Sequence, residues 1–133
     1  MPKMSFKKYW IEKSNYSLNV DVLENLKESI HIFPEFRREI VKVDGNHAIV
    51  KVNVNIKQTD IVPFSIDVTI CGLFECENWE NTDIGHEFIF ITSVQTLFPY
   101  LRQAVSTITG MSNVPQYVLP IVNVRTLFDP KQK

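Results

Sequence analysis

Two stretches of strict alternation constrain the fold of this chain more than any other feature of its sequence. Within residues 47–58, Val50, Val52, Val54 and Ile56 alternate with lysine or asparagine, and residues 63–74 repeat the pattern with serine, aspartate and threonine as the polar partners. A period of two places successive side chains on opposite faces of a strand, and one wet face is typical of antiparallel sheets. The tight-turn residues Asp44-Gly45-Asn46 favour a hairpin with a preceding strand over residues 35–43. We therefore expect an antiparallel sheet whose inward face carries Val50, Val52, Val54, Ile56, Phe64, Ile66, Val68 and Ile70.

Residues 6–19 predict a further strand, rich in tyrosine, tryptophan and isoleucine. Tyr9 and Ile11 share one face of this strand, and Trp10 lies on the other. Apolar residues on both faces suit a strand that meets another subunit. Ser14 and Asn15 weaken the pattern, so we expect a bulge or kink there.

A helical period of 3.6 residues appears in residues 96–110. Pro99 lacks an N–H and fits a first turn best, which predicts a helix start close to it. Gly110 suits a helix end that needs a left-handed residue. Gly72 falls on the inward face of the preceding strand, where a missing side chain lets a helix come close. The apolar stripe of the helix consists of Leu97, Leu101, Ala104, Val105 and Ile108.

Three other segments are less sharply defined. Residues 20–32 have helix-like apolar spacing and fit either one or two helical turns or an irregular crossover. Residues 84–92 contain Phe88-Ile89-Phe90-Ile91, whose propensity favours a strand. Residues 115–120 are bounded by prolines and predict an extended stretch, after which Asn123 can cap a short final helix through Phe128.

Composition and charge exclude several classes of protein. The chain has 14 Lys+Arg against 15 Asp+Glu, a formal charge of −1, which argues against nucleic-acid binding. No apolar run approaches the roughly 18–20 residues of a membrane-spanning helix. The charged N-terminus lacks the apolar region of a signal peptide. We therefore expect a single domain over residues 1–133, in the cytoplasm and without membrane insertion.

Patterns for catalysis or metal binding are weak. Cys71 and Cys76 lack the second pair that a zinc site needs, and we expect two reduced thiols in or beside a strand. His31, His47 and His86 are scattered, and no His-Glu-x-x-His pattern occurs. None of the four glycines lies in a phosphate-binding cluster. We expect no enzymatic activity, no metal and no cofactor.

One set of motifs resembles the SecB family of export chaperones. The chain reads Leu97-Phe98-Pro99-Tyr100-x-Arg102, then Pro115-Gln116, then Val122-Asn123-x-x-x-Leu127-Phe128. The C-terminal half of SecB has Leu-Phe-Pro-Tyr-x-Arg-Glu, Pro-Gln and Pro-Val-Asn-Phe-x-x-Leu-Phe in the same order. The resemblance is strongest over residues 63–128 and weaker over the first sixty.

This resemblance implies an α+β fold: a four-stranded antiparallel sheet with a long helix and a short C-terminal helix packed on one face. It also implies a lid segment with a short helix near residues 84–92, and a homotetramer built as a dimer of dimers. The implied function is that of an ATP-independent holdase, which binds unfolded or precursor polypeptides in a hydrophobic groove and is linked to protein export. The alternative is a SecB-like module dedicated to one partner, such as an antitoxin.

Apolar and aromatic side chains exceed what a small core obviously needs. From the sequence alone, core and groove are equally good explanations for them, and the resemblance favours the groove. The candidate client-binding residues are Ile32, Phe33, Phe36, Phe74, Trp79, Phe88, Phe90, Tyr100, Tyr117 and Phe128.

Docking of the motor protein SecA depends in SecB on acidic residues of the outer sheet face. The corresponding positions in the first strand here are Asn15 and Asn19, which are neutral, and Ser65 stands where leucine is usual. Only Asp67 keeps its carboxylate, and the chain ends in a basic segment in place of an acidic tail. We therefore expect weakened or absent SecA docking.

Overall fold

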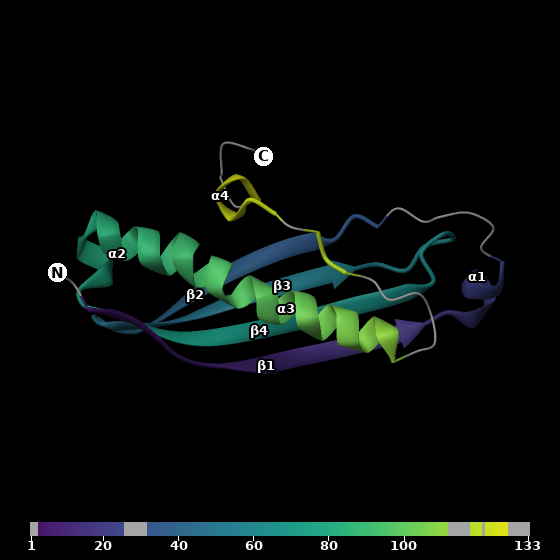
Figure 1. The fold of residues 1–133 in the computed structure, drawn as a ribbon, viewed down its shortest axis with the longest axis horizontal. Helices are drawn as coiled ribbons and strands as arrows, with labels where there is room; N and C mark the ends of the chain where they lie inside the picture. Colours follow the sequence, from purple (N-terminus) through teal and green to yellow (C-terminus); the bar gives the residue numbers. More distant parts are fainter. Residues whose placement is uncertain (1–2, 26–31, 112–117, 121, 128–133) are drawn as a thin grey trace.

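The computed structural model describes residues 3–25, 32–111, 118–120 and 122–127, and its centre is a four-stranded antiparallel sheet (Figure 1). The strands are β1 (Met4–Leu18), β2 (Glu35–Asp44), β3 (His47–Ile56) and β4 (Phe64–Cys76). They lie in the order β1-β4-β3-β2, so β1 and β2 form the two edges. The predicted α+β fold is confirmed.

The alternation of residues 47–58 and 63–74 is the alternation of burial along β3 and β4. Every second residue of β3, from Ala48 to Ile56, is at most 3% exposed, and the residues between them are half-buried. The buried side chains of both strands face α3 (Ser93–Gly110), which crosses β4, β3 and β1 on one side of the sheet. The other side, here called the open face, carries the residues between them, most of which are polar.

The register of β1 places Tyr9 opposite Gly72 and Ile11 opposite Ile70, on the helix side, and Trp10 on the open face. This confirms the predicted two-sided strand. The predicted bulge at Ser14 and Asn15 is wrong, because these residues pair regularly with Val68 and Asp67. The register instead shifts between Phe6 and Lys8 and between Ile11 and Lys13.

Four further helical elements precede α3 in the described part of the chain. For residues 20–32 the sequence left helical turns and an irregular crossover as alternatives. The structure has a single helical turn there, α1 (Val20–Glu24), which is capped by Asn19, and residues 26–31 lie outside the described residues. After β4 come η1 (Trp79–Asn81) and α2 (Asp83–Glu87). The Phe88–Ile91 run is helical and not a strand: it lies in the π-helical turn η2 (Phe88–Thr92). Burial of Ile89, at 0% exposure, overrides the local β propensity.

The helix α3 begins at Ser93, so Pro99 lies inside the helix and not in its first turn. The turns before Pro99 persist because Val94 and Leu97 are fully buried. Side-chain hydroxyls also satisfy carbonyl groups in this region: Thr96 donates to the Thr92 carbonyl at 2.9 Å, and Ser93 donates to that of Ile89. Pro99 itself is exposed, which leaves water access to the carbonyl that its missing N–H would have bonded.

Two glycines were predicted to have special roles in and beside α3. A Cβ atom on Gly72 would lie 2.8 Å from a methyl group of Leu97, which confirms the close approach of helix and sheet. The helix ends at Gly110 as predicted, but no described glycine has a positive φ, so the left-handed role of Gly110 is wrong.

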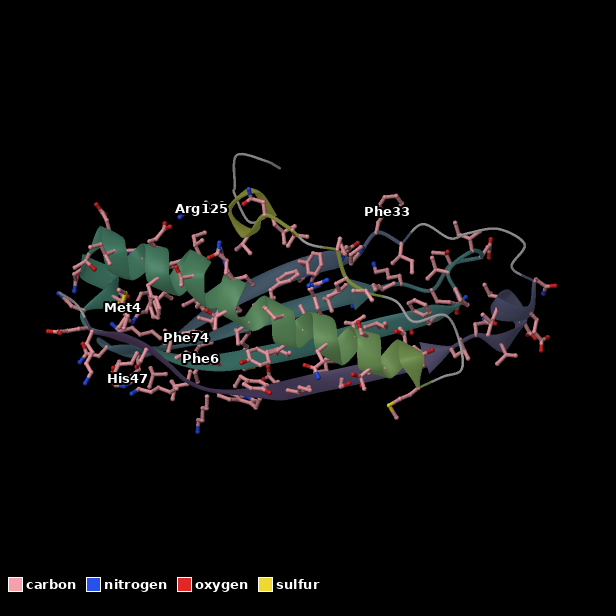
Figure 2. All side chains as sticks on the ribbon, viewed as in Figure 1. Met4, Phe6, Phe33, His47, Phe74 and Arg125 are labelled. Atoms are coloured by element: carbon pink, nitrogen blue, oxygen red, sulfur yellow. The ribbon has the colours of Figure 1, made fainter. Side chains whose placement is uncertain are left out.

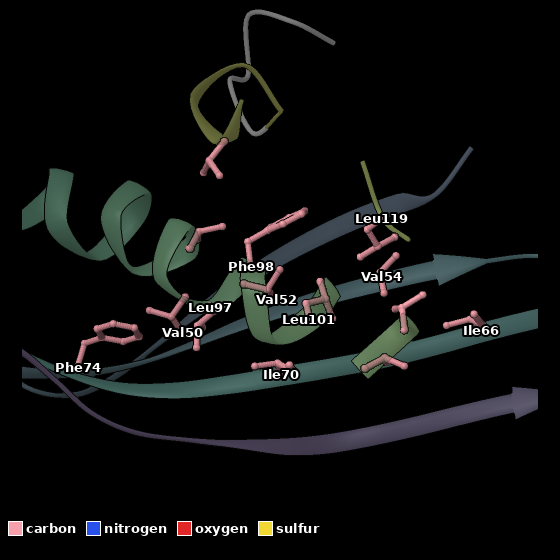
Figure 3. Packing of buried hydrophobic residues seen from close by; sticks show 14 of the residues in the cluster. Val50, Val52, Val54, Ile66, Ile70, Phe74, Leu97, Phe98, Leu101 and Leu119 are labelled. Atoms are coloured by element: carbon pink, nitrogen blue, oxygen red, sulfur yellow. The ribbon is translucent and has the colours of Figure 1, made fainter. Parts of the chain in front are cut away.

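The C-terminal part of the chain is described only in pieces. Residues 118–120 form no regular element, and most of the predicted extended stretch lies outside the described residues. The short helix α4 (Val124–Leu127) begins after Asn123, whose side-chain oxygen accepts a hydrogen bond from the Arg125 N–H at 3.0 Å. Leu119 and Val124 are nearly fully buried and belong to the core, and Figure 3 shows Leu119 on the helix side of the sheet. None of the described helices is both long and apolar enough to cross a membrane.

Candidate functional site

The most exposed large aromatic side chain among the described residues is Phe33, which is 85% exposed and precedes β2 by two residues. Figure 2 shows it projecting away from the body of the molecule. Beside it lies a hollow of about 270 Å³ whose apolar lining includes Ile32, Ile56, Ile61 and Val62. We call the apolar surface formed by Ile32, Phe33, Phe36 and Ile61 the β2 patch.

The β2 patch continues along the helix side of β2. Phe36 is half-buried, and its ring centroid lies 5.2 Å from that of Phe98 on α3. Arg38, the next residue on this side, donates a hydrogen bond to the Phe90 carbonyl at 2.7 Å, and its guanidinium lies 5.3 Å from the Phe90 ring centroid. Partial burial lowers the pKa of the Arg38 guanidinium group. Arg38 therefore fixes β2 to the π-helical turn.

The structure separates the predicted client-binding residues into three groups. Phe74 and Trp79 are 0% and 4% exposed and belong to the core, so neither is accessible in this conformation. Tyr117 and Phe128 lie outside the described residues. Phe33 is exposed, and the remaining residues are half-buried: Ile32, Phe36, Phe88, Phe90 and Tyr100.

The half-buried aromatics do not form one surface. Tyr100 stacks on Tyr9 of β1 with ring centroids 4.1 Å apart, on the opposite side of α3 from the β2 patch. Phe88 packs edge-on against Phe74 at 5.9 Å. Of the described candidates, Ile32, Phe33 and Phe36 lie at the start of β2, and Phe90 lies further along the strand, against Arg38.

Sequence reasoning missed Ile61 and Val62 in the β3–β4 connection. Ile61 is 58% exposed, whereas Val62 is 6% exposed and joins the core. An apolar pair between Asp60 and Pro63, in an otherwise polar connection, was the signal that could have identified them.

A second hollow, of about 300 Å³, lies between β1 and α3. Its apolar lining comes from Tyr9, Ile11, Tyr100, Ala104 and Ile108, and Gln103 and Thr107 form its polar rim. Tyr9 and Ile11 are 47% and 51% exposed, so the two-sided first strand presents apolar side chains to solvent on its helix side.

The open face of the sheet carries several ion pairs and side-chain hydrogen bonds. Asp67 accepts hydrogen bonds from Lys13 and from the Asn53 amide, each at 2.7 Å, and the Lys13 ammonium group is the main cause that lowers its pKa. Glu12 pairs with Lys51 at 2.9 Å and accepts a hydrogen bond from the Cys71 thiol at 3.3 Å. Burial and that carboxylate raise the pKa of Cys71 to about 12, so the thiol is unreactive at neutral pH.

Metal-binding clusters of three or more His, Cys, Asp or Glu side chains do not occur in the part of the chain that the structure describes. His86 bonds to the Glu80 carbonyl at 2.9 Å, and Glu87 pairs with Arg125 of α4. Both side chains of the His86-Glu87 pair thus have structural partners.

These features define a class of protein: an antiparallel sheet, covered by helices on one face, that presents an apolar patch beside an edge strand. The family model for SecB, described as preprotein translocase subunit SecB, matches residues 19–133. The chain therefore belongs to the SecB family.

Comparison with individual proteins agrees with this assignment. The chain is 30% identical over 124 residues to the uncharacterized protein MJ0357 of Methanocaldococcus jannaschii, covering 91% of this chain and 79% of that protein. It is 32% identical over 81 residues to the protein-export protein SecB of Ruegeria pomeroyi and 27% over 90 residues to that of Ehrlichia ruminantium. These two alignments cover 59% and 62% of this chain, but only 48% and 52% of the SecB proteins.

Solved structures share the fold. The SecB-like chaperone Rv1957 of Mycobacterium tuberculosis, solved with a ChAD peptide from the HigA1 antitoxin, superposes with a TM-score of 0.69 at 16% identity, over 90% of both chains. A protein of unknown function from Streptococcus agalactiae superposes with a TM-score of 0.51 at 12% identity, over 91% of this chain and 99% of that one.

Proposed function

We propose that this chain is an ATP-independent holdase chaperone of the cytoplasm, which binds unfolded or precursor polypeptides at the β2 patch without covalent chemistry. The observation that carries the proposal is Phe33, 85% exposed beside half-buried Phe36 on a SecB-family fold. A large aromatic ring held in water beside other apolar groups gains about 25 cal/mol per Å² when a partner covers it. An exposed apolar surface of this kind is typical of interaction sites.

Apolar contact also explains how one patch can serve many clients. Burial of aromatic and branched side chains requires no fixed client sequence, so affinity follows the apolar content of the client segment. Ordering the flexible client opposes binding, which keeps each contact reversible. Release then follows from client folding or from transfer to a partner, and no nucleotide is required.

The test is suppression of aggregation of a reduced, unfolded client, measured beside thermal melts. Phe33→Asp removes the exposed ring, and Ile84→Asp is a matched control because Ile84 is 53% exposed on α2, away from the β2 patch. We expect the Phe33 variant to lose most of its holding activity with an unchanged melt, and the Ile84 variant to keep both. Full activity of a folded Phe33→Asp variant would refute the proposal.

We further propose that the protein works as a homotetramer, a dimer of dimers. The hollow between β1 and α3, with exposed Tyr9 and Ile11, supplies one apolar contact surface. The exposed polar residues Gln103 and Thr107 on α3 allow close approach of a second helix. A monomeric mass by light scattering at micromolar concentration would contradict this assembly.

A dedicated binding module, with one specific partner such as an antitoxin, is the second candidate. One observation favours it: Asp67, the acid that remains of the SecA-docking pattern, is engaged by Lys13 and Asn53. A carboxylate held in this way contributes little to a charged interface with another protein. We expect calorimetric titration with SecA at low salt to give weak or no binding, and submicromolar affinity would rule the expectation out. One stoichiometric partner in a pull-down would favour the dedicated module.

A further inference from the structure

The open face of the sheet carries a row of apolar side chains towards the turn that joins β2 to β3. Val41 of β2 pairs with Ile49 of β3, and Ile49 pairs with Leu73 of β4, so these three side chains are neighbours on this face. Trp10 of β1 lies diagonally beside Leu73, because its own partner is Cys71. Val41 is 37% exposed, and the other three are half-buried. We call Trp10, Val41, Ile49 and Leu73 the open-face row.

The dimensions of the open-face row suit a helix. The helix that covers the sheet, α3, lies on the opposite side (Figure 1). Apolar residues of a sheet are normally buried against a second layer, and a row that stays partly exposed is typical of an interaction surface. Neighbouring strands lie about 4.8 Å apart, so a row across four strands extends about 15 Å, the length of about ten helical residues. A preformed helix also loses less conformational freedom on such a flat surface than an unfolded client segment does.

The charges of the open face favour an acidic partner. Four acidic side chains of this face are already in ion pairs with lysine or histidine: Glu12, Glu39, Asp67 and Glu75. Within the described residues, Lys8, Arg37 and Lys57 form no ion pair on this face, and Glu35 is the one acidic residue there in the same state. The Lys8 ammonium group lies 5.8 Å from the Trp10 ring centroid, directly beside the row. A surplus of unpaired cations is complementary to carboxylates on a partner.

We propose that the open-face row docks an amphipathic helix of a second, folded protein, with the apolar stripe of the helix on the row and a carboxylate of the helix beside Lys8. This partner is distinct from the clients proposed for the β2 patch. The row also lies away from the SecA-docking pattern, because Leu73 and Asp67 are separated by about 20 Å along β4 at about 3.3 Å per residue. That pattern requires acidic side chains on the chaperone, whereas the open-face row requires them on the partner.

The experiment titrates two hydrocarbon-stapled helical peptides of about 14 residues into the full chain. Both carry one stripe of leucines, and the other positions are mainly glutamate in one peptide and mainly lysine in the other. We expect the glutamate peptide to bind, and the lysine peptide to bind at least about fivefold more weakly. Leu73→Thr keeps a residue with strand propensity and should weaken binding of the glutamate peptide at least about fivefold, while Phe33→Asp should leave it unchanged.

A charge variant tests the contact with the carboxylate. Lys8→Glu should weaken binding of the glutamate peptide about threefold and strengthen that of the lysine peptide. Lys3→Glu, the same charge change at an exposed residue before β1, is the control and should alter neither affinity. Because Lys8 is exposed, this test stands even if Leu73→Thr lowers the stability of the fold.

Other occupants of the row give different results. A lower assembly mass of a folded Leu73→Thr variant would assign the row to a second copy of this chain, and reduced client holding would assign it to clients; either result would overturn the proposal. Equal binding of the two peptides, or no binding of the glutamate peptide, would also overturn it. Full holding activity of Phe33→Asp would refute the proposed function and leave this inference intact.

Discussion

The two edges of the sheet carry comparable aromatic residues that the fold treats differently. On the β1 side, Phe6 stacks on Phe74 at 5.0 Å and Tyr9 stacks on Tyr100 at 4.1 Å, so both rings pack against the chain's own strand and helix, although Tyr9 stays 47% exposed. On the β2 side, Phe33 has no such cover. Figure 2 shows Phe6 and Phe74 within the body of the molecule and Phe33 outside it.

The cause of this difference is the path of α3. The helix crosses β4, β3 and β1, and Phe98 and the π-helical turn reach towards β2 from the helical layer. A helix that does not centre on a four-stranded sheet leaves one edge strand half-covered. The comparison teaches that exposure of an aromatic side chain here depends on helix placement and not on the local sequence around the ring.

The largest effect should come from removing a ring on the covered side. Phe74→Ala deletes a fully buried side chain that contacts Phe6 and Phe88, and should cost about 3–5 kcal/mol of unfolding free energy. Denaturant unfolding measures the loss, and holding activity per folded molecule should stay unchanged. A variant with native stability but reduced holding would make Phe74 a client contact and would break the comparison.

The next effect concerns the apolar side chains that β1 leaves exposed. Ile11→Asp places a charge in the hollow between β1 and α3 and should lower the mass of the assembly, because a charge buried in an apolar contact is strongly unfavourable. Light scattering measures the mass. Ile84→Asp, at nearly equal exposure (53% against 51% for Ile11), should leave the mass unchanged. Equal masses for the two variants would show that self-association does not use the hollow between β1 and α3.

The smallest effect lies at the turn that joins β2 to β3. His47 lies 2.8 Å from Asp44 and 3.1 Å from Glu75, and these carboxylates, Asp44 first, raise its pKa. Protonated His47 therefore stabilises the fold fully below the ordinary histidine pKa of about 6.5, and the gain disappears as pH rises through the raised folded value. The melting temperature of the His47→Gln variant should lie below that of the unsubstituted chain at pH 5.5 and approach it at pH 8.5. A constant difference across this range would contradict the assignment.

Sequence patterns predicted the sheet well because the alternation of apolar and polar residues along a strand directly reflects which side chains face the core. Val50 to Ile56 face the core because a period of two allows no other solution with one wet face. The helical layer was harder to predict. The Phe88–Ile91 run has strand propensity, yet Thr82 caps α2 through the Gly85 N–H at 2.9 Å and the chain continues as helix into α3, past Pro99.

The candidate site was predictable only in part, for a physical reason. Phe33, Phe74 and Trp79 are all aromatic, and their exposed fractions of 85%, 0% and 4% follow from which segments pack over them. No local pattern carries that information, since it depends on contacts between residues far apart in the sequence. Family resemblance supplied the expectation of a groove, and the three-dimensional arrangement shows which of the candidate residues are accessible.

The central claim is that clients bind beside β2 and not on the open face. Photo-crosslinking tests it directly: benzoylphenylalanine replaces Phe33 in one variant and Val41, which is 37% exposed on the open face of the same strand, in another. Each variant is irradiated with a reduced, unfolded client, and crosslinked adducts are quantified. The account predicts strong crosslinking from position 33 and little from position 41. Equal yields, or a higher yield from position 41, would contradict it.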